Sequence, residues 1–317
     1  MNPWSLFWRQ GHSTTFGDYF KQGYVGAVAD WWQSKLDGLP ENATVMELGC
    51  GNCSLLPAMI ASGVKGKYIG VDIAEVSPSP VAQQGLAESG IELVLHSATP
   101  AEKVPQPDAS ADLVASVFGI EYSDMERSVP EAARVLKPGG RFCSLVHHDN
   151  SLITGMSRRA ISEFSSDDLR KVIESLTMIS TERDRIVNLS GLKSSYKAEK
   201  GRKTINSLAQ KYLSDTNLET MNATMFEVMT QALKFFKMMG ASSQQRRDFI
   251  AWLEAEQRAS HERFQQMVSV AFDAEGIEAL QAMFEAAGFQ DLKTEVIHSD
   301  KDILAWGLQA DKMQERL

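Results

Sequence analysis

Short β-rich apolar runs alternate with helical patterns between residues 44 and 148, and this alternation constrains the fold more than any other feature. Strand-length runs separated by helix-length segments are typical of βαβ units, in which each helix crosses between two parallel strands. A stop of the form Lys137-Pro138-Gly139-Gly140 closes the last of these helices. The sequence therefore predicts strands at 44–49, 67–73, 92–97, 112–118 and 141–148, with helices near 53–62, 80–89 and 124–136.

The remaining segments surround this region. Residues 1–40 are rich in tryptophan, phenylalanine and tyrosine, and we interpret them as a helical flank buried against the sheet. Residues 151–272 carry almost only helical patterns, and a helix at 275–287 then leads into strands near 292–298 and 303–310. We therefore expect an α/β fold: a core (41–150 and 273–317) with a doubly wound, seven-stranded, mostly parallel sheet, and an all-helical insertion (151–272).

Composition and charge exclude several classes of protein. Hydrophobic residues make up 43% of the 317 residues and charged residues 23%, which is ordinary for a folded globular chain. No run approaches the roughly 18 apolar residues of a spanning helix, and the N-terminus lacks a basic signal-peptide region, so we expect no membrane partner and a cytoplasmic protein. The net charge of −9 disfavours binding to nucleic acid, which requires a basic surface.

A glycine-rich turn follows the first predicted strand. In Glu47-Leu48-Gly49-Cys50-Gly51 the glycines stand where a strand turns into a helix, a place that accepts the polar part of a nucleotide-like ligand. A dinucleotide fingerprint would need a third glycine at position 54, which is Ser54. Glu47 would repel a pyrophosphate but attract a cationic group. Asp72 stands 21 residues after Gly51, the spacing at which an acidic side chain meets ribose hydroxyls.

The turn also contains a C-x-x-C pair, Cys50 and Cys53. This spacing occurs in redox pairs and as half of a zinc site, but Cys143, the third and last cysteine, does not supply a second pair. We interpret the cysteines as small packing residues of a chain from a reducing compartment, and we predict no metal site.

Taken in order, the motifs resemble those of class I S-adenosylmethionine-dependent methyltransferases, and most of all the ubiquinone/menaquinone-biosynthesis type that acts on small molecules. The resemblance covers residues 44–150 and 273–311, about half of the chain. The matching segments are Glu47-Leu48-Gly49-Cys50-Gly51, Gly70-Val71-Asp72-Ile73, Asp112-Leu113-Val114, Arg134-Val135-Leu136-Lys137-Pro138-Gly139-Gly140 and Glu285-Ala286-Ala287-Gly288-Phe289.

The resemblance implies S-adenosylmethionine as cofactor and S-adenosylhomocysteine as product. It places Glu47 at the methionine amino group, Asp72 at the ribose and Ile73 against the adenine. The family usually has an aspartate after the third strand to contact the adenine amino group, whereas this chain has Ser97-Ala98 there. The third glycine of the family's loop is Cys53. The implied cofactor contacts are thus Glu47, Gly49, Gly51, Asp72, Ile73, Ser97, Ala98 and Phe118.

Candidate catalytic residues follow strands four and five, because ligands of parallel α/β sheets bind at the carboxyl ends of the strands. Neighbouring strand residues point to opposite faces, so only one of His147 and His148 should face the methyl acceptor. We predict His147 as the base, with Tyr122 and Glu121 beside it. Asp149-Asn150 resembles the pair of magnesium-dependent relatives, but Glu121 matches their further carboxylate only loosely.

The insertion allows two interpretations. Met221, Met225 and Met229 recur at helical spacing, as in a helix core or a homodimer seam, but flexible thioethers also suit an apolar substrate pocket. The insertion leaves the sheet where the acceptor must sit, and its apolar faces must be buried. We therefore predict that it forms a lid over the acceptor pocket.

The predicted function is transfer of a methyl group from S-adenosylmethionine, directly and in line, to oxygen or nitrogen of a small, partly apolar metabolite. Two alternatives remain open. One is methylation of RNA or protein, and the other is a non-catalytic protein that binds the cofactor and uses its insertion for assembly.

Overall fold

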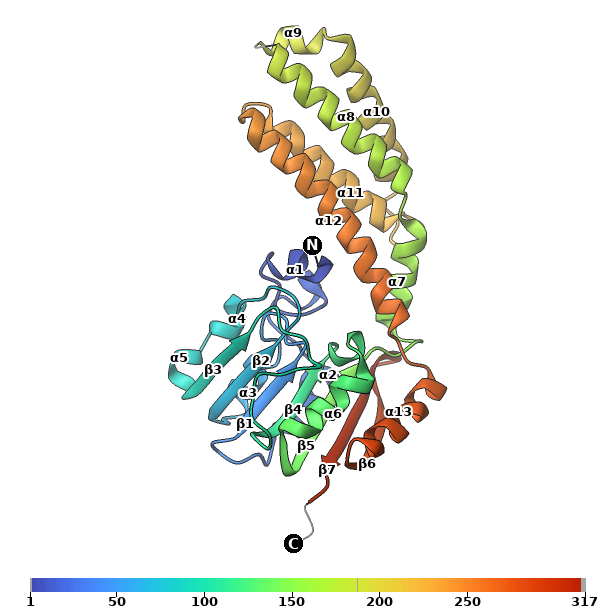
Figure 1. Ribbon diagram of the computed structural model, residues 1–317. Coiled ribbons are helices and arrows are strands. Elements are labelled where there is room, and N and C mark those ends of the chain that lie inside the picture. Colours follow the sequence, from blue (N-terminus) through green and yellow to red (C-terminus); the bar gives the residue numbers. More distant parts are fainter. Residues whose placement is uncertain (1, 187, 315–317) are drawn as a thin grey trace. The chain divides into compact units, whose positions relative to one another are not determined.

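The computed structural model describes residues 2–186 and 188–314. The chain divides into two compact units, an α/β unit (1–156 with 266–317) and a helical unit (157–265), coloured by sequence in Figure 1. The predicted core segment 273–317 ends in residues 315–317, which lie outside the described part. Within the described residues no helix is both long enough and apolar enough to cross a bilayer.

The α/β unit is built on one seven-stranded sheet with the order β3-β2-β1-β4-β5-β7-β6. The first five strands are parallel, while β7 runs antiparallel to β5 and to β6. This confirms the predicted fold class. The strands are β1 (Thr44–Leu48), β2 (Gly66–Val71), β3 (Ile91–His96), β4 (Ala111–Val117), β5 (Leu136–Val146), β6 (Phe289–Ser299) and β7 (Asp302–Lys312).

Helices cover both faces of the sheet. On one face, α2 (Ala27–Leu36) and α3 (Leu56–Ala61) pack in a core with Val45 and Tyr68. On the other, α6 (Met125–Val135) and α13 (Ala274–Ala286) pack in a core with Met46 and Ile69. Alternate residues of each strand thus enter opposite cores, which explains the nearly unbroken apolar strand sequences.

Most predicted boundaries differ from the structure by one to three residues, and three elements differ for reasons that particular residues explain. The helix predicted at 80–89 is two short helices, α4 (Pro80–Gln83) and α5 (Leu86–Ser89), because Gly85 between them has a φ of 76°. Helix α3 begins after residue 53, since Cys53 has a φ of 64° that no α-helix accommodates. Strand β5 begins at Leu136, ahead of the predicted 141, and a register shift opposite Ala111 and Leu113 absorbs its proline and glycines.

The N-terminal flank does not pack as one layer. Trp31 and Trp32 of α2 lie in the sheet core as predicted. The first helix, α1 (Pro3–Trp8), instead places Phe7 and Trp8 in a small separate cluster with Ala74, at the end of β2; a 3₁₀ turn, η1 (Gly17–Phe20), leads towards α2. The prediction that the whole flank lies against the sheet is therefore wrong for α1.

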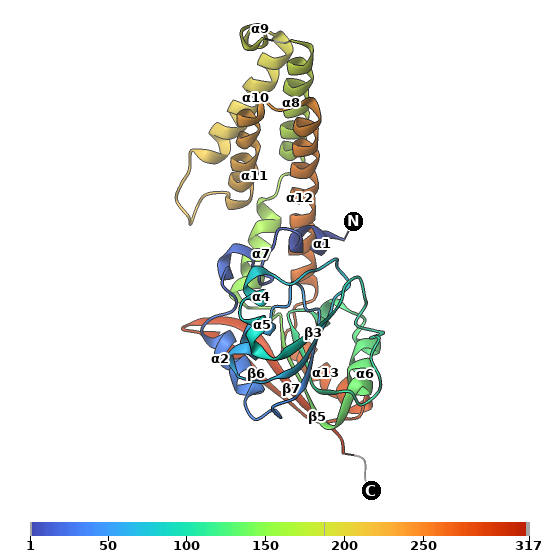
Figure 2. The same ribbon diagram turned by 90° about the vertical axis from the view of Figure 1, so that its left-hand side faces the viewer.

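The helical unit has a core of its own. Helices α8 and α10 lie side by side in both Figure 1 and Figure 2. Met225 and Met229 are fully buried in this core, next to Leu176 and Ile205. The helices are α7 (Leu152–Glu163), α8 (Ser166–Arg185), α9 (Leu189–Lys193), α10 (Tyr196–Leu213), α11 (Ala223–Lys234), η3 (Phe235–Met238) and α12 (Ser243–Ser269); α7 and α12 continue into the α/β unit.

The methionine pattern is therefore a core pattern. The helices bury their apolar faces against one another. The lid prediction assumed that these faces would be buried against the acceptor pocket, and this assumption is wrong. That the insertion covers the acceptor pocket stays a prediction, supported now by chain order alone.

Met229→Ala tests the independence of the helical core. Removing a fully buried side chain should lower the free energy of unfolding of the helical unit by roughly 2–5 kcal/mol. Urea unfolding followed by the helical circular dichroism signal measures this change. Leu218→Ala, at a side chain that is 80% exposed, is the matched control and should change stability by less than about 0.5 kcal/mol. Equal effects of the two substitutions would contradict the assigned core.

Candidate active site

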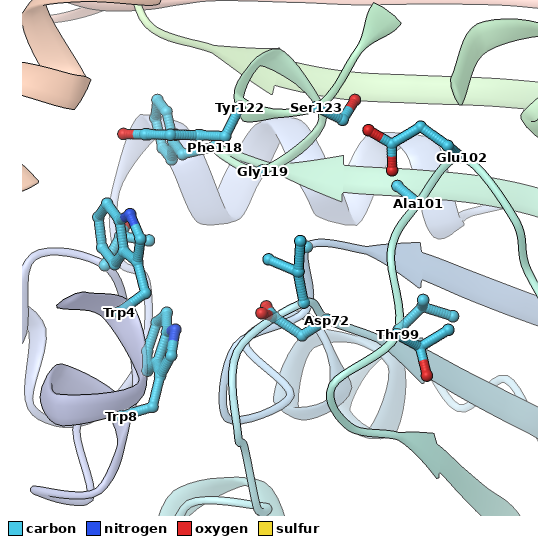
Figure 3. A pocket seen from close by; sticks show the side chains of 14 residues that line it. Trp4, Trp8, Asp72, Thr99, Ala101, Glu102, Phe118, Gly119, Tyr122 and Ser123 are labelled. Atoms are coloured by element: carbon cyan, nitrogen blue, oxygen red, sulfur yellow. The ribbon is translucent and has the colours of Figure 1, made fainter. Parts of the chain in front are cut away.

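The site lies where the sheet order reverses. Strand β1 lies between β2 and β4, and in open α/β sheets ligands bind in the crevice at the carboxyl ends of such strands. A pocket opens there within the α/β unit, and the space inside it, including the part open to solvent, is about 630 Å³. Its walls, shown in Figure 3, are Trp4, Trp8, Thr15, Gly49, Val71, Asp72, Ile73, Thr99, Ala101, Glu102, Phe118, Gly119, Tyr122 and Ser123.

Two glycines meet at the reversal point. A Cβ built on Gly49 would lie 2.6 Å from the Cα of Gly119, and a Cβ on Gly119 would lie 2.8 Å from the Cα of Gly49. Gly49 also has a φ of 67°, which side chains rarely tolerate. The loops after β1 and β4 can therefore approach each other only because neither carries a side chain there.

Asp72, at the end of β2, lies in the pocket as predicted. Its Oδ2 accepts a hydrogen bond from the Gly51 backbone N–H at 2.7 Å, and its Oδ1 accepts one from the Ala74 N–H at 2.7 Å. Burial raises the pKa of this carboxyl to about 6, against the opposite effect of the two N–H donors. Ile73 is 64% exposed and also lines the pocket. The Asp72 carboxylate can accept hydrogen bonds from ribose hydroxyls, and the apolar Ile73 side chain can pack against a flat base.

Glu47 lies beneath the glycine-rich turn. The carboxyl is fully buried and is not part of the pocket wall. Oε1 accepts from the Ser54 hydroxyl at 2.7 Å, and Oε2 accepts from the Leu55 N–H at 3.2 Å and from the Tyr68 hydroxyl. Burial raises its pKa to about 7. Glu47 thus holds the glycine-rich turn, and its contact with the methionine amino group stays a prediction from the resemblance.

Gly51 is likewise covered, here by the indole of Trp8. A Cβ on Gly51 would lie 2.4 Å from Cζ2 of that ring, so the turn and α1 are in close contact. Gly51 is not part of the pocket wall; it contributes its N–H to Asp72.

Ser97 and Ala98 also stand outside the pocket wall. The Ser97 hydroxyl accepts from the Val76 N–H at 3.0 Å and donates to the Ala74 carbonyl at 3.4 Å, so it supports the neighbouring loop. Residues further along the same connection, Thr99, Ala101 and Glu102, line the pocket instead. The sequence motif thus indicated the loop that reaches the pocket, and the cofactor contacts of Ser97 and Ala98 stay predictions.

The predicted catalytic residues form one buried group after β4 and β5. The Tyr122 hydroxyl lies 2.9 Å from His147 Nε2, and Tyr122 lines the pocket whereas His147 does not. His147 is fully buried, its Nδ1 has no partner among the described residues, and burial lowers its pKa to about 3. His147 is therefore a neutral imidazole that reaches the pocket through Tyr122.

The two histidines point in different directions, as the strand geometry required. His148 stacks on Trp306 at 4.6 Å, and its Nδ1 accepts from the Asn150 N–H at 2.9 Å. The His148 ring therefore packs on β7 and is not part of the pocket wall. Phe118, with a φ of 55°, packs its ring 4.9 Å from that of His147 and forms part of the pocket wall.

Glu121 supports His147 from behind. Its Oε1 accepts from the His147 backbone N–H at 3.1 Å, while its buried Oε2 has no partner within the described part of the chain. Burial raises its pKa to about 8. Glu121 does not line the pocket, so it can act only through its neighbours.

An aromatic wall from α1 completes the pocket, and no motif had indicated it. The Trp4 ring lies 5.4 Å from that of Tyr122, and its Nε1 donates to Gln266 Oε1 at 2.8 Å. Only the density of aromatic residues in the flank could have signalled such a wall. Figure 3 shows Trp4, Trp8, Phe118 and Tyr122 at one end of the pocket, and Thr99, Ala101, Glu102 and Ser123 at the other.

Asn52, inside the glycine-rich turn, attaches α1 to the site. Its buried side-chain amide donates to the backbone carbonyls of Trp8 at 2.8 Å and His12 at 3.0 Å. Its Oδ1 accepts from the Ser77 N–H at 3.2 Å. One side chain thus joins the turn, the N-terminal segment and the loop after β2.

The cysteines and the acidic residues do not form a metal centre in the described residues, where no group of three or more potential ligands occurs. Cys50, Cys53 and Cys143 are free thiols and buried. The backbone N–H of Asp149 donates to Phe272 at 2.8 Å, which places this residue beside the chain that returns from α12.

Comparison with known proteins agrees with the geometry. A family model described as a methyltransferase domain matches residues 46–144. The malonyl-(acyl-carrier protein) O-methyltransferase of Methylococcus capsulatus is 29% identical over 127 residues, which are 38% of this chain and 45% of that protein. A ubiquinone/menaquinone biosynthesis C-methyltransferase of a Caulobacter species is 40% identical over 62 residues, 19% of this chain and 25% of that protein.

A solved structure described as a possible histamine N-methyltransferase from Thermotoga maritima aligns over 98% of this chain and 99% of that chain, at 13% identity and a TM-score of 0.41. The chain spans less than half the length of the curated relatives above. Residues 46–144 thus match a methyltransferase domain, and the matches support the predicted family, the class I S-adenosylmethionine-dependent methyltransferases. S-adenosylmethionine is the cofactor of this family, so the predicted family and cofactor are confirmed.

Gly119→Ala tests the contact of the two loops. The new Cβ would lie 2.8 Å from both the Gly49 Cα and the Leu48 carbonyl oxygen, so backbone must move, at a cost of about 1–3 kcal/mol in the free energy of unfolding. Gly155→Ala, in α7 with no atom within 4 Å of the new Cβ, should instead stabilise by roughly 0.5–1 kcal/mol. Chemical denaturation measures both changes. A Gly119→Ala variant with an unchanged free energy of unfolding would contradict the close contact of the two loops.

Glu121→Gln tests the buried acid through pH. The unfolded side chain loses its proton near pH 4.5, whereas burial keeps the folded one protonated up to about pH 8. Between these values the folded state binds the extra proton, so the contribution of Glu121 to stability falls as pH rises. The stability of the variant relative to the natural protein should therefore increase from about pH 5 to about pH 9 in urea titrations.

Glu126→Gln is the control for that experiment, because Glu126 is exposed on the adjacent helix α6. Its stability difference from the natural protein should show no comparable increase with pH. A constant difference for Glu121→Gln would mean that the carboxyl titrates normally in the folded state.

Proposed function

We propose that the chain transfers a methyl group from S-adenosylmethionine to an oxygen or nitrogen atom of a small, partly apolar acceptor. The observation that carries the proposal is the pocket at the reversal point of the sheet, with Asp72 in the middle and Tyr122 at its aromatic end. None of the fourteen residues that line it is Lys, Arg or His, so an anionic acceptor would find no countercharge among them.

The residues present fit the cofactor. The Gly49 and Gly119 backbones leave a side-chain-free floor, and Asp72 offers carboxylate oxygens to ribose hydroxyls. When bound, S-adenosylmethionine supplies a methyl group on a positively charged sulfur, and the acceptor atom bonds to that carbon as the carbon–sulfur bond breaks and the electron pair stays on sulfur. Aromatic faces such as those of Trp4 and Phe118 favour a nearby positive charge.

Tyr122 would orient the acceptor. In the tautomer of His147 whose Nε2 carries no proton, the Tyr122 hydroxyl donates to Nε2, and its oxygen lone pairs can accept a hydrogen bond from the acceptor O–H or N–H. Holding the nucleophile in line with the methyl group accounts for much of the rate of such a transfer. Because burial lowers the pKa of His147 to about 3, this ring is a poor proton acceptor, and its part in the proposal is to hold the Tyr122 hydroxyl in place, while Glu121 holds the His147 backbone N–H.

The alternative substrates, RNA and protein, have less support. The net charge is −9, and no Lys, Arg or His lines the pocket, so the site offers no basic surface to a polyanion. A covering role for the helical insertion and a homodimer formed through it both belong to this proposal as expectations.

Ligand binding is the first test. S-adenosylhomocysteine should raise the melting temperature, since a ligand that binds only the folded state stabilises it by about 2.7 kcal/mol at 100 times its Kd. Asp72→Ala should remove most of this shift, and Asp30→Ala, at an exposed position on α2, should retain it. No shift in the natural protein, or a full shift in Asp72→Ala, would contradict the assigned site.

Turnover is the second test, with acceptors found by screening for release of S-adenosylhomocysteine. Tyr122→Phe keeps the ring against Trp4 but removes the hydroxyl, so kcat should fall by about a hundredfold or more while the Kd for S-adenosylhomocysteine is unchanged. His148→Gln should leave kcat within a few fold. Activity should persist in excess chelator. A loss of activity that magnesium restores would show that a metal takes part.

A further inference from the structure

The pocket wall holds few groups that can exchange a proton. Asp72, Glu102 and Tyr122 are the titratable side chains among the described residues that line it. Asp72 uses both carboxylate oxygens on backbone N–H donors. Glu102 accepts from the Asp124 N–H at 2.8 Å and lies at the end opposite Tyr122 (Figure 3). The end of the pocket that contains Tyr122 therefore has no carboxylate in its wall.

Tyr122 and His147 do not supply a base at that end. Burial raises the pKa of the Tyr122 phenol, so the hydroxyl keeps its proton near neutral pH. Burial lowers the pKa of His147 to about 3, so the imidazole behind Tyr122 binds a proton poorly. An acceptor that has to give up a proton during the transfer would find no group in this part of the wall to receive it.

Hydroxyl and amine acceptors differ in this requirement. A hydroxyl oxygen that attacks the methyl carbon with its proton attached becomes an oxonium ion, a strong acid, so transfer to oxygen needs a base. An amine nitrogen attacks with its lone pair: the nitrogen–carbon bond forms, the carbon–sulfur bond breaks, and the electron pair of that bond stays on sulfur. The positive charge moves from sulfur to nitrogen, and the product is a stable ammonium ion. Transfer to an uncharged amine thus needs no base in the site.

The aromatic end of the pocket suits an ammonium product. The ring centroid of Trp4 lies 6.3 Å from that of Trp8 and 5.4 Å from that of Tyr122, and Phe118 lies at the same end (Figure 3). Several aromatic rings around one space attract a cation, as in sites that recognise quaternary ammonium groups. The described residues of the wall include no lysine or arginine that would repel such a cation.

We propose that the methyl acceptor is the nitrogen atom of a small amine, and that the aromatic rings at this end of the pocket hold the cationic nitrogen after the transfer. The inference rests on the proposed function and decides between its two acceptor atoms. The amine reacts in its uncharged form, after its ammonium proton has passed to water. An N–H of the amine donates to the Tyr122 oxygen, and the nitrogen lone pair stays free for the methyl carbon.

The experiment compares two ligands of the same shape that differ in one atom, meta-hydroxyphenyl-trimethylammonium and the uncharged meta-tert-butylphenol. Calorimetric titrations are carried out with S-adenosylhomocysteine at saturation, so that the cofactor site is filled. The natural protein should bind the cation about tenfold or more tightly than the uncharged ligand, because its quaternary nitrogen resembles the methylated product.

Trp4→Leu should remove most of this preference, because it deletes one ring and leaves the charge of the protein unchanged. Trp4→Phe should leave an intermediate preference, since a phenyl ring attracts a cation less strongly than an indole. Trp252→Leu, at a side chain that is 39% exposed on α12 and outside the pocket wall, should keep the preference of the natural protein. Melting temperatures without ligand show whether each variant is folded, and either Trp4 variant alone suffices to decide the question.

The position of the transferred methyl group is the second measurement. Any acceptor that screening identifies should carry the new methyl group on nitrogen, as located by mass spectrometry. The alcohol with the same carbon skeleton should release no S-adenosylhomocysteine above background. For the amine, kcat/KM should rise with pH up to the pKa of the amine itself, because only its uncharged form reacts.

Equal binding or no binding of the two probe ligands, an undiminished preference in the folded Trp4 variants, or an acceptor methylated at oxygen would overturn the choice of nitrogen. Each of these results leaves the proposed function in place, provided that S-adenosylhomocysteine binds. Failure of S-adenosylhomocysteine to bind the natural protein would overturn the proposed function and this inference with it.

Discussion

The contact between the turns that follow β1 and β4 is the constraint on which the site depends. The strand order makes these two strands neighbours, and Gly49 and Gly119 let their loops approach to within the space that a side chain would fill. Both loops carry features of the site next to this contact. In the loop after β1 the Gly51 N–H donates to Asp72, and in the loop after β4 Phe118 has a left-handed conformation. Such backbone strain is found mainly at binding and catalytic sites, where the surrounding structure maintains it.

Buried carboxyls hold these loops in place. Glu47 joins the turn after β1 to Tyr68 of β2, Asp72 joins it to the end of β2, and Glu121 joins the turn after β4 to β5. Burial raises the pKa of all three, so each is less readily ionised than a solvent-exposed acid. The three acids therefore hold the loops in place, and among them only Asp72 also lines the pocket.

The sequence alone predicted what depends on local pattern. Alternating apolar runs identified the seven strands, and the spacing of Gly51 and Asp72 identified one pocket residue correctly. It could not show that Ser54, Leu55 and Tyr68 would take both oxygens of Glu47, since those partners come from two separate segments. Trp4 and Glu102 were missed for the same reason: they enter the pocket through tertiary packing, and neither lies in a recognisable motif. The methionine pattern could not distinguish a helix core from a substrate pocket. Periodicity shows which face of a helix is apolar, but it does not show what packs against that face.

The three hydrogen bonds of the Asn52 side chain have a consequence for the order in which the molecule assembles. Its carbonyl partners, Trp8 and His12, precede it by 44 and 40 residues, and the N-terminal segment that contains them adds no strand to the sheet. These bonds can form only when the turn that bears Asn52 has its final shape, so α1 takes its place after that turn has formed. In the native state the same segment can open without breaking a strand pairing, so we expect amide hydrogen exchange there to precede exchange in the strands. The aromatic end of the pocket can thus be dismantled and rebuilt while the sheet below it stays folded.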